Sequence, residues 1–321
     1  MSMQPRIAVL VPCRNEAITV AEVVRAFKGA LPQATVYVYD NNSSDRTAAA
    51  ATEAGAVVRR EPMPGKGNVV RRMFADIDAD IYVMVDGDGT YDAGVAPEMV
   101  HRLVEDNLDM VVATRATDRN GGAFRRGHRT GNWTLTRFVG WLFDPRFSDI
   151  FSGYRAFSRR YVKSFPALAS GFEVETELTI HALELKMPIA EVTAPYSARP
   201  EGSRSKLSTW RDGVRIFAAI VFLFKEARPF KFFGVLASAL ALMSMALAWP
   251  LFVTYLETGL VPRYPTAVLV TGIMLMAFLA LACGIVLDTV SRGRREAKRL
   301  RYLALGPVAG ADSADRRTAS E

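Results

Sequence analysis

Two aspartates separated by one glycine follow the apolar run Ile81–Val85, in the order Asp86-Gly87-Asp88. Carboxylates at this spacing after a strand can face one hard cation, and Mg²⁺ or Mn²⁺ held by few protein oxygens can bridge to a diphosphate. A plain turn is the alternative, because aspartate and glycine both favour turns. The strongly apolar run before the pair, together with polar clusters elsewhere in the chain, favours the metal.

A further carboxylate, Asp40, ends the run Thr35–Tyr39 and can accept the ring N–H of a uracil or a guanine. The Asn-Asn-Ser-Ser-Asp that follows is typical of a turn and a helix cap. Lys66 lies between two glycines, in a loop suited to a nucleotide or its phosphates. The spacing of a P-loop is missing there, and no G-x-G-x-x-G follows the first expected strand, so a dinucleotide enzyme is disfavoured.

Arginines predict a second anion site. Arg115 follows the expected strand Met110–Ala113, and Arg129 comes after a loop that contains Gly121-Gly122 and Arg125-Arg126. Guanidinium groups suit phosphate oxygens, because their fork of N–H donors matches the anion. The alternative is a solvated basic loop near anionic lipid headgroups.

These residues need a scaffold, and residues 6–200 alternate short β-rich runs with helical stretches. Strands are expected at Ile7–Val11, Thr35–Tyr39, Ala56–Arg59, Ile81–Val85 and Met110–Ala113. Helices are expected at Glu16–Ala30, Ser44–Ala54, Asn68–Ile77 and Ala96–Glu105. The alternation predicts an α/β fold whose mostly parallel sheet is covered by helices on both faces. Ligands bind beyond the carboxyl ends of such strands, which is where the polar clusters fall.

In this order, VPCRNE, YDNNSSD, the GKG loop, DGD, SGYRAF and RPEGSRSK resemble the family 2 inverting glycosyltransferases with the GT-A fold, over about residues 6–210. Within that family the chain is most similar to the polyprenyl-phosphate glycosyltransferases, relatives of dolichyl-phosphate mannose synthase. The resemblance implies a Rossmann-like GT-A domain, a nucleotide-sugar donor and a polyprenyl-phosphate acceptor of the undecaprenyl or dolichyl type. UDP is favoured over GDP as the donor nucleotide.

The resemblance also implies roles on the donor side. The nucleotide site is expected to comprise six residues: Pro12, Asn15, Glu16, Asp40, Lys66 and Asp86. Asp40 would hold the nucleobase, in a pocket shaped by the first three. Asp86 and Asp88 would serve the metal and the sugar nucleotide, with Asp88 as the direct ligand. Close relatives often carry glutamine where this chain has Thr90, which leaves the third ligand open.

On the acceptor side the resemblance assigns Arg115 and Arg129 to the lipid phosphate. Asp149 begins a D-x-x-S-G-x-R stretch and would orient the acceptor or act as a base. A phosphate monoester is mostly dianionic at neutral pH, so it needs no strong base. The RPEGSRSK stretch would close on the diphosphate as a mobile loop through Arg199, Ser205 and Lys206, although one extra residue leaves the register of Arg199 open. The expected catalytic residues are Asp88, Arg115, Arg129, Asp149 and Lys206.

Three glutamates alternate in the stretch GFEVETEL, at positions 173, 175 and 177. We interpret them as a charged helix face, with the alternative that one is the base used by other members of the family. His181, one helical turn later, is interpreted as a structural residue.

Two stretches without charge, residues 232–256 and 266–287, each exceed the roughly 20 residues needed to span a bilayer. Lysines and arginines flank their outer ends, whereas the loop between them has only Arg263. The positive-inside rule therefore predicts a hairpin with both ends in the cytosol. No secretory signal is found at the N-terminus. We expect a multi-pass protein of the inner (cytoplasmic) membrane, with its catalytic domain on the cytoplasmic side.

The expected segments are a cytosolic glycosyltransferase domain (1–208), an amphipathic interface helix region (209–230), transmembrane helices at 231–257 and 264–288, and a basic juxtamembrane segment with a disordered tail (289–321). The apolar residues 216–224 could instead form an ordinary helix packed on the domain. The formal charge is +7, but the densest basic run follows a span, so no nucleic-acid partner is expected. Two cysteines exclude a disulfide scaffold. Small residues in the first span could pack helices together in a homo-oligomer.

The sequence therefore predicts a membrane-bound inverting enzyme that builds a polyprenyl-phosphate-sugar for cell-envelope glycan or glycolipid assembly. One alternative is a processive polysaccharide synthase, which predicts more spans and a Q-x-x-R-W stretch that this sequence lacks. The other is a non-catalytic, membrane-tethered protein that only binds a nucleotide-sugar. Product formation separates the last reading from the first.

Overall fold

The structure is a computed structural model of the 321-residue chain. It describes residues 5–306 except 117–148, 172, 198, 201–217, 219, 220 and 223. Contacts divide the chain into two compact units, one made of residues 1–219 and 298–321 and the other of residues 220–297. Each unit is described by itself.

A seven-stranded sheet with the order β3-β2-β1-β4-β6-β5-β7 forms the centre of the first unit. Its strands are β1 (Ile7–Cys13), β2 (Thr35–Asp40), β3 (Val57–Arg60), β4 (Ile81–Met84), β5 (Met110–Ala116), β6 (Arg155–Ser158) and β7 (Ile189–Pro195). Every neighbouring pair is parallel except the two that involve β6, which runs antiparallel between β4 and β5. The predicted mostly parallel α/β sheet is confirmed, and the antiparallel strand is an addition to it.

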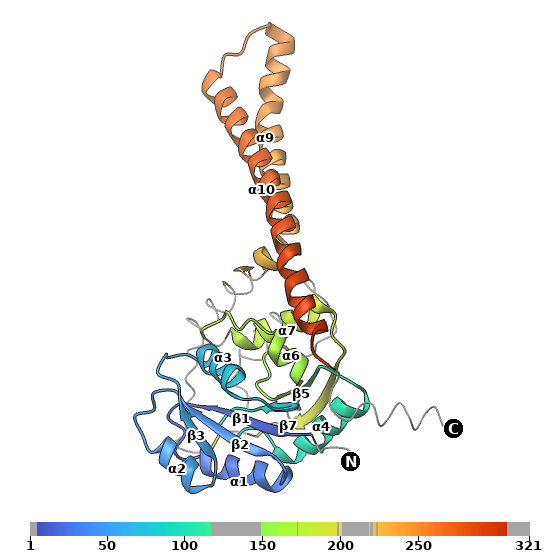
Figure 1. Ribbon diagram of the computed structural model, residues 1–321. Helices are drawn as coiled ribbons and strands as arrows, with labels where there is room; N and C mark the ends of the chain where they lie inside the picture. The colour runs from blue at the N-terminus through green and yellow to red at the C-terminus, as the bar shows by residue number, and fades with distance from the viewer. Residues whose placement is uncertain are drawn as a thin grey trace, which may run out of the picture. The chain divides into compact units, whose positions relative to one another are not determined.

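Helices cover both faces of this sheet, as Figure 1 shows. On one face lie α1 (Val20–Ala30), α2 (Thr47–Glu53) and α4 (Ala96–Glu105), with the 3₁₀ turn η1 (Ala93–Val95) ahead of α4. On the other face lie α3 (Lys66–Asp76), α6 (Arg159–Ser164) and α7 (Val174–Leu185). Because both faces are covered, β1 and β4 consist almost entirely of buried apolar residues.

Helix α1 buries one stripe of apolar side chains against the sheet: Val20, Val23, Val24 and Phe27. The helix begins at Val20 rather than at the expected Glu16. The hydroxyl of Thr19 donates to the carbonyl of Gly87 (2.6 Å), and the backbone N–H of Glu16 donates to the hydroxyl of Thr47 (2.8 Å). These two bonds hold residues 16–19 in a turn that joins the carboxyl ends of β1, β2 and β4.

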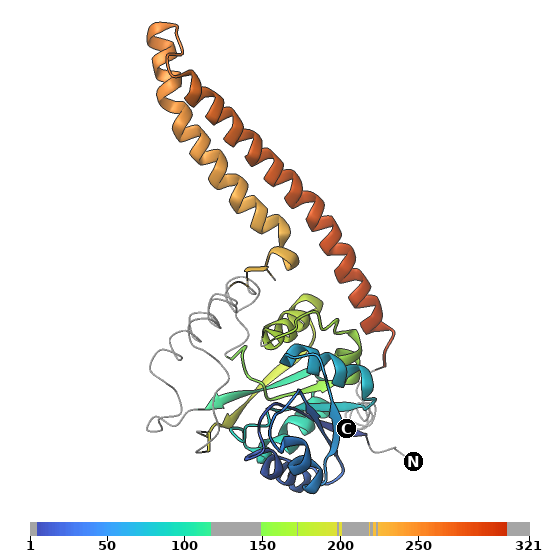
Figure 2. The ribbon, with the colours of Figure 1, turned by 90° about the vertical axis from the view of Figure 1, so that its left-hand side faces the viewer.

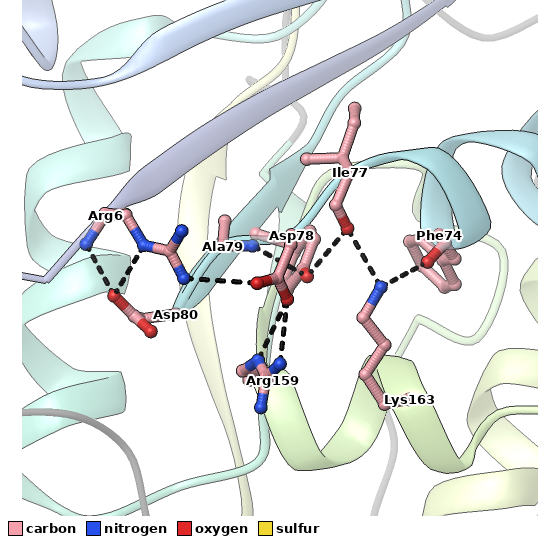
Figure 3. Close-up of polar contacts among 9 residues, drawn as sticks. Arg6, Phe74, Ile77, Asp78, Ala79, Asp80, Arg159 and Lys163 are labelled. Carbon is pink, nitrogen blue, oxygen red and sulfur yellow. Dashed lines mark hydrogen bonds and ion pairs between the residues drawn. The ribbon is translucent and has the colours of Figure 1, made fainter.

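An ion-pair network lies at the opposite, amino ends of the strands (Figure 3). Arg6 contacts Asp78 and Asp80, and Arg159 approaches Asp78 to 2.9 Å, so the starts of β1, β4 and α6 are joined. Lys163 donates to two carbonyls at the end of α3. Asp78 is 54% exposed, and exposed pairs each contribute at most about 1 kcal/mol. This edge is structural, and the polar clusters lie at the other edge.

The second unit is a hairpin of two long helices, α9 (Pro229–Thr258) and α10 (Tyr264–Leu303), which run antiparallel in Figure 2. Both are long and apolar enough to cross a membrane, with a mean hydropathy of 1.9 and 2.5 in their most apolar windows. Only 11% of each window is buried, so nearly all of this apolar surface faces outward. The hydroxyl of Ser244 donates to the carbonyl of Val270 (2.9 Å) and joins the two helices. Helix α10 continues through the basic segment as far as Leu303.

A pH-dependent stability is expected from His181, which is buried on α7. Its Nε2 lies 3.1 Å from the hydroxyl of Ser164, and the rings of Tyr161 and Phe165 pack against it. Burial lowers the pKa of His181 to about 3 from an ordinary 6.5. The unfolded chain therefore takes up a proton below pH 6.5 that the folded chain refuses until about pH 3, so this contribution to stability is lost as the pH falls through that window.

Thermal unfolding of wild type and His181→Asn in detergent, in steps from pH 7.5 to pH 4, checks this expectation. The variant should be less stable at pH 7.5. Its free energy of unfolding should then fall less steeply below pH 6.5, by about 1 kcal/mol per pH unit relative to wild type. Parallel curves for the two proteins would contradict the assignment.

Candidate active site

The turns after β1 and β2 are tied to each other, which brings the first two polar clusters together. Cys13 pairs with Asp40 in the sheet register. Asn15, whose φ of 52° is left-handed, accepts a hydrogen bond at Oδ1 from the backbone N–H of Ser44 (2.7 Å) and donates its own N–H to Ser43 (2.9 Å). The residues expected around the nucleobase therefore lie on neighbouring segments: Pro12, Asn15, Glu16 and Asp40.

Asp40 has an unused acceptor. Its side chain is buried, and Oδ1 has no hydrogen-bond partner among the described residues. Buried polar atoms are normally paired, so this oxygen is available to accept from a further donor, such as one on a ligand. The imide N–H of a nucleobase has this chemistry.

Lys66, the first residue of α3, lies between two carboxylates. Its Nζ is 2.5 Å from Asp86 Oδ1 and 2.5 Å from Glu175 Oε1, and its side chain is only 9% exposed. Burial alone lowers the pKa of Lys66, but the attraction of Asp86 and Glu175 outweighs burial and the pKa is raised. The ammonium is therefore charged, and it joins the start of α3 to the end of β4 and the start of α7.

The interpretation of the alternating glutamates as a charged helix face was wrong for two of the three. Glu175 and Glu177 are both buried. Burial raises the pKa of Glu175 even though Lys66 opposes that shift. Glu177 accepts the backbone N–H groups of Leu168 (2.9 Å) and Ala169 (2.8 Å), and it thereby fixes the loop that precedes α7.

Asp86 and Asp88 follow β4, as predicted, and each is paired with a cation. Asp88 accepts from the hydroxyl of Thr90 (2.6 Å) at Oδ1 and from Arg199 (2.6 Å) at Oδ2. A Cβ on Gly153 would meet the carboxylate of Asp86, so a larger residue at this position of the SGYR stretch would displace that side chain. Thr90 binds the carboxylate of Asp88 and so supports its orientation.

The donor set of Asp86 and Asp88 fits a hard divalent cation. Carboxylate oxygens are the ligands of Mg²⁺, which commonly uses one or two carboxylates and takes its other ligands from water and phosphates. Among the described residues, no group of three or more His, Cys, Asp or Glu side chains is arranged to hold a metal ion. A metal at this pair would therefore take its remaining ligands from water or from the oxygens of a diphosphate.

Arg115, on β5, is held in a bidentate pair by Asp149. Nε lies 2.6 Å from Oδ2 and Nη2 lies 2.8 Å from Oδ1. Burial raises the pKa of Asp149, but hydrogen bonds from Arg115 outweigh burial and leave it below its usual value. Asp149 is thus an anion with both oxygens occupied, which suits it to position Arg115 rather than to accept a proton.

Two tyrosines that the motifs did not reveal connect the acidic residues after β4 with Arg115 on β5. The guanidinium of Arg115 lies over the ring of Tyr196 (5.6 Å), which packs edge-on against Tyr91 (5.2 Å). The hydroxyl of Tyr91 accepts the backbone N–H of Gly153 (3.1 Å), next to Asp86. Nothing in the sequence pattern distinguishes these tyrosines from ordinary core aromatics.

Arg155 of the SGYR stretch is fully buried and holds the loop that carries Asp149. It donates to the carbonyls of Ile150 (2.7 Å) and Ser152 (2.9 Å) and to the hydroxyl of Thr179 (3.0 Å). Its contacts are structural. The expected residues Arg129, Ser205 and Lys206, and most of the interface helix region 209–230, lie outside the described residues.

The sequence of this chain is similar to those of known glycosyltransferases. The sequence model of the family described as glycosyl transferase family 2 matches residues 8–165. Glycosyltransferase AglJ of Haloferax volcanii is 32% identical over 305 residues, which cover 92% of this chain and 98% of that protein. An uncharacterized protein of Shigella flexneri is 54% identical over 153 residues, covering 48% of this chain and 94% of that protein.

More distant relatives share the fold. Dolichol-phosphate mannosyltransferase of Pyrococcus furiosus is 25% identical over 220 residues, covering 63% of this chain and 59% of that protein. Glucosyl-3-phosphoglycerate synthase of Mycobacterium tuberculosis, in a crystal structure with Mn²⁺, uridine-diphosphate and phosphoglyceric acid, superposes with a TM-score of 0.58 at 23% identity. The match covers 68% of this chain and 78% of that chain, and it shows the GT-A fold.

Removing Glu175 should destabilise the first unit strongly, because it breaks a buried charge cluster. We expect Glu175→Ala to lower the free energy of unfolding by about 3 kcal/mol. The exposed pair of Arg46 and Glu53 supplies the matched control, and Glu53→Ala should change stability by less than about 1 kcal/mol. Thermal unfolding of the full chain in detergent measures both. Equal losses in the two variants would show that the buried cluster has no special weight.

Proposed function

The chain belongs to glycosyl transferase family 2, and from that premise we propose that it moves a sugar from a nucleotide-sugar to a polyprenyl phosphate at a membrane surface. The observation that carries the proposal is that Asp86 and Arg115 lie at the same end of the sheet, connected through Gly153, Tyr91 and Tyr196. An acidic half and a basic half side by side suit a donor diphosphate with its metal and an anionic acceptor.

The donor half supports a uridine nucleotide. The unpaired Oδ1 of Asp40 suits an imide N–H, and the acidic pair after β4 suits Mg²⁺ or Mn²⁺. Glucosyl-3-phosphoglycerate synthase, which shares the fold, was crystallised with Mn²⁺ and uridine-diphosphate-glucose, and this favours UDP over GDP. When bound, the cation would offset charge on the departing diphosphate.

The acceptor half supports a phosphate nucleophile. Arg115 presents a fixed guanidinium, and Asp149 holds it without competing for a proton. In the proposed reaction a phosphate oxygen attacks the anomeric carbon from the face opposite the diphosphate. The new C–O bond forms as the bond to the diphosphate breaks, and the configuration inverts. Because the acceptor is already an anion, the residues mainly supply orientation.

The second unit supports a lipid acceptor. Two helices that can cross a membrane would keep the enzyme in the bilayer that contains a polyprenyl chain. Lysines and arginines outside both spans favour the cytosolic side for the domain we place at residues 1–208, and the region 209–230 is proposed to lie at the interface. Arg129, Ser205 and Lys206 remain proposed contacts of the lipid phosphate and the diphosphate.

Loss of Asp88 should abolish transfer. We expect Asp88→Asn to reduce transfer of radiolabelled sugar from UDP-sugars to undecaprenyl phosphate, in detergent with Mn²⁺, by at least about 100-fold. Asp106→Asn, which changes an exposed aspartate at the end of α4, is the matched control and should keep wild-type activity. Undiminished transfer by Asp88→Asn would exclude a metal at this position.

Asp149→Asn should weaken binding of the acceptor and leave binding of the donor unchanged. The amide cannot pair with both guanidinium nitrogens as an anion does, so Arg115 loses its fixed orientation. The KM for undecaprenyl phosphate should rise about tenfold, with the KM for the nucleotide-sugar unchanged. Initial rates with each substrate varied in turn measure both constants. A rise in the donor KM instead would place Asp149 in the donor half.

A further inference from the structure

We propose that Arg199 is an internal counter-ion of Asp88, and that it must leave this carboxylate before a divalent cation can bind there. The inference rests on the proposed function, since it concerns the metal of the same site. It goes further by assigning to a side chain of this chain a role that competes with the metal.

The two carboxylate oxygens of Asp88 have different hydrogen-bond partners, and Arg199 binds Oδ2. Oδ1 accepts from both the backbone N–H (3.1 Å) and the hydroxyl (2.6 Å) of Thr90, which are part of its own turn. Oδ2 accepts from Nη2 of Arg199 at 2.6 Å. The carboxylate is only 7% exposed, so a cation that approaches Oδ2 meets the guanidinium.

The two cations of the acidic pair differ in how easily they can move. Lys66 is 9% exposed and is held by Asp86 and Glu175 together. Displacing it would deprive both Asp86, which is 29% exposed, and the buried Glu175 of the cation that they share, which is costly. The side chain of Arg199 is 30% exposed and can exchange the carboxylate for water. We therefore expect Arg199 to leave Asp88 readily and the ammonium of Lys66 to stay bound to Asp86.

Charge balance points the same way. Among the described residues, the ion pairs of this cluster join three carboxylates to two cations, so one negative charge is left over. Departure of Arg199 leaves two, which a divalent cation neutralises. A diphosphate that arrives with the metal also offers the guanidinium a new anionic partner. Metal and nucleotide should therefore strengthen each other's binding.

Isothermal titration of Mn²⁺ into the full chain in detergent, without nucleotide, tests the proposal. Arg199→Ala and Arg199→Gln should each bind Mn²⁺ about five- to tenfold more tightly than wild type, because the competing ion pair is gone. Arg199→Lys keeps the charge and should stay near wild type. Arg72→Ala removes an arginine from a surface ion pair with Asp76 and is the matched control, with unchanged affinity.

A second titration with UDP present separates this effect from a general loss of positive charge. UDP should increase the Mn²⁺ affinity of wild type more than that of Arg199→Ala, since only wild type must move the guanidinium. Thermal unfolding of each variant without metal confirms that it is folded, and the glutamine variant keeps the packing of the side chain if the alanine variant is unstable.

The outcomes distinguish this inference from the proposed function. If Asp88→Asn loses Mn²⁺ binding but neither Arg199→Ala nor Arg199→Gln gains affinity, the metal site stands and the role of Arg199 is overturned. If Asp88→Asn binds Mn²⁺ like wild type, or if wild type binds no Mn²⁺ even with UDP present, the metal of the proposed function is excluded and this inference with it.

Discussion

Mutual repulsion between carboxylates gathered at one sheet edge is the constraint that shapes this site. Asp86 and Asp88 follow β4, and Glu175 lies on α7. Lys66 lies between Asp86 and Glu175, and Arg199 neutralises Asp88. Lys66 joins α3, β4 and α7 in doing so, and Arg199 joins β4 to the end of β7. The start of α3 and the segment after β7 thus place two positive charges beside the carboxylates. The absence of a side chain at Gly153 leaves space for Asp86.

The acidic half and the basic half use charge differently. In the acidic half the cations neutralise carboxylates that a metal and a nucleotide would later use. In the basic half the carboxylate of Asp149 holds Arg115, whose guanidinium also lies over the ring of Tyr196. The ion pairs at the amino ends of the strands are exposed and tie elements together without any such arrangement (Figure 3).

The positions of two acidic residues in the fold could be predicted from sequence because they follow from local rules. Asp40 and Asp86 come at the ends of buried strands, where parallel topology brings side chains to one edge. Glu175 was misjudged because alternating glutamates near a helix start suggest solvent, and its partner Lys66 is remote in the chain. The antiparallel β6 was missed for a similar reason, since RAFS is too short to signal its pairing with β4 and β5.

That inserted strand has a geometric consequence. Neighbouring strands lie about 4.8 Å apart, so placing β6 between β4 and β5 separates the ends of those two strands by roughly 10 Å. In the proposed reaction the residues that bind the departing diphosphate follow β4, and the arginine that binds the acceptor phosphate lies on β5. In the proposed reaction, this separation leaves space for one sugar ring between the two binding groups. If β4 paired directly with β5, this separation would be half as large, and the transferred sugar would not fit between the two groups.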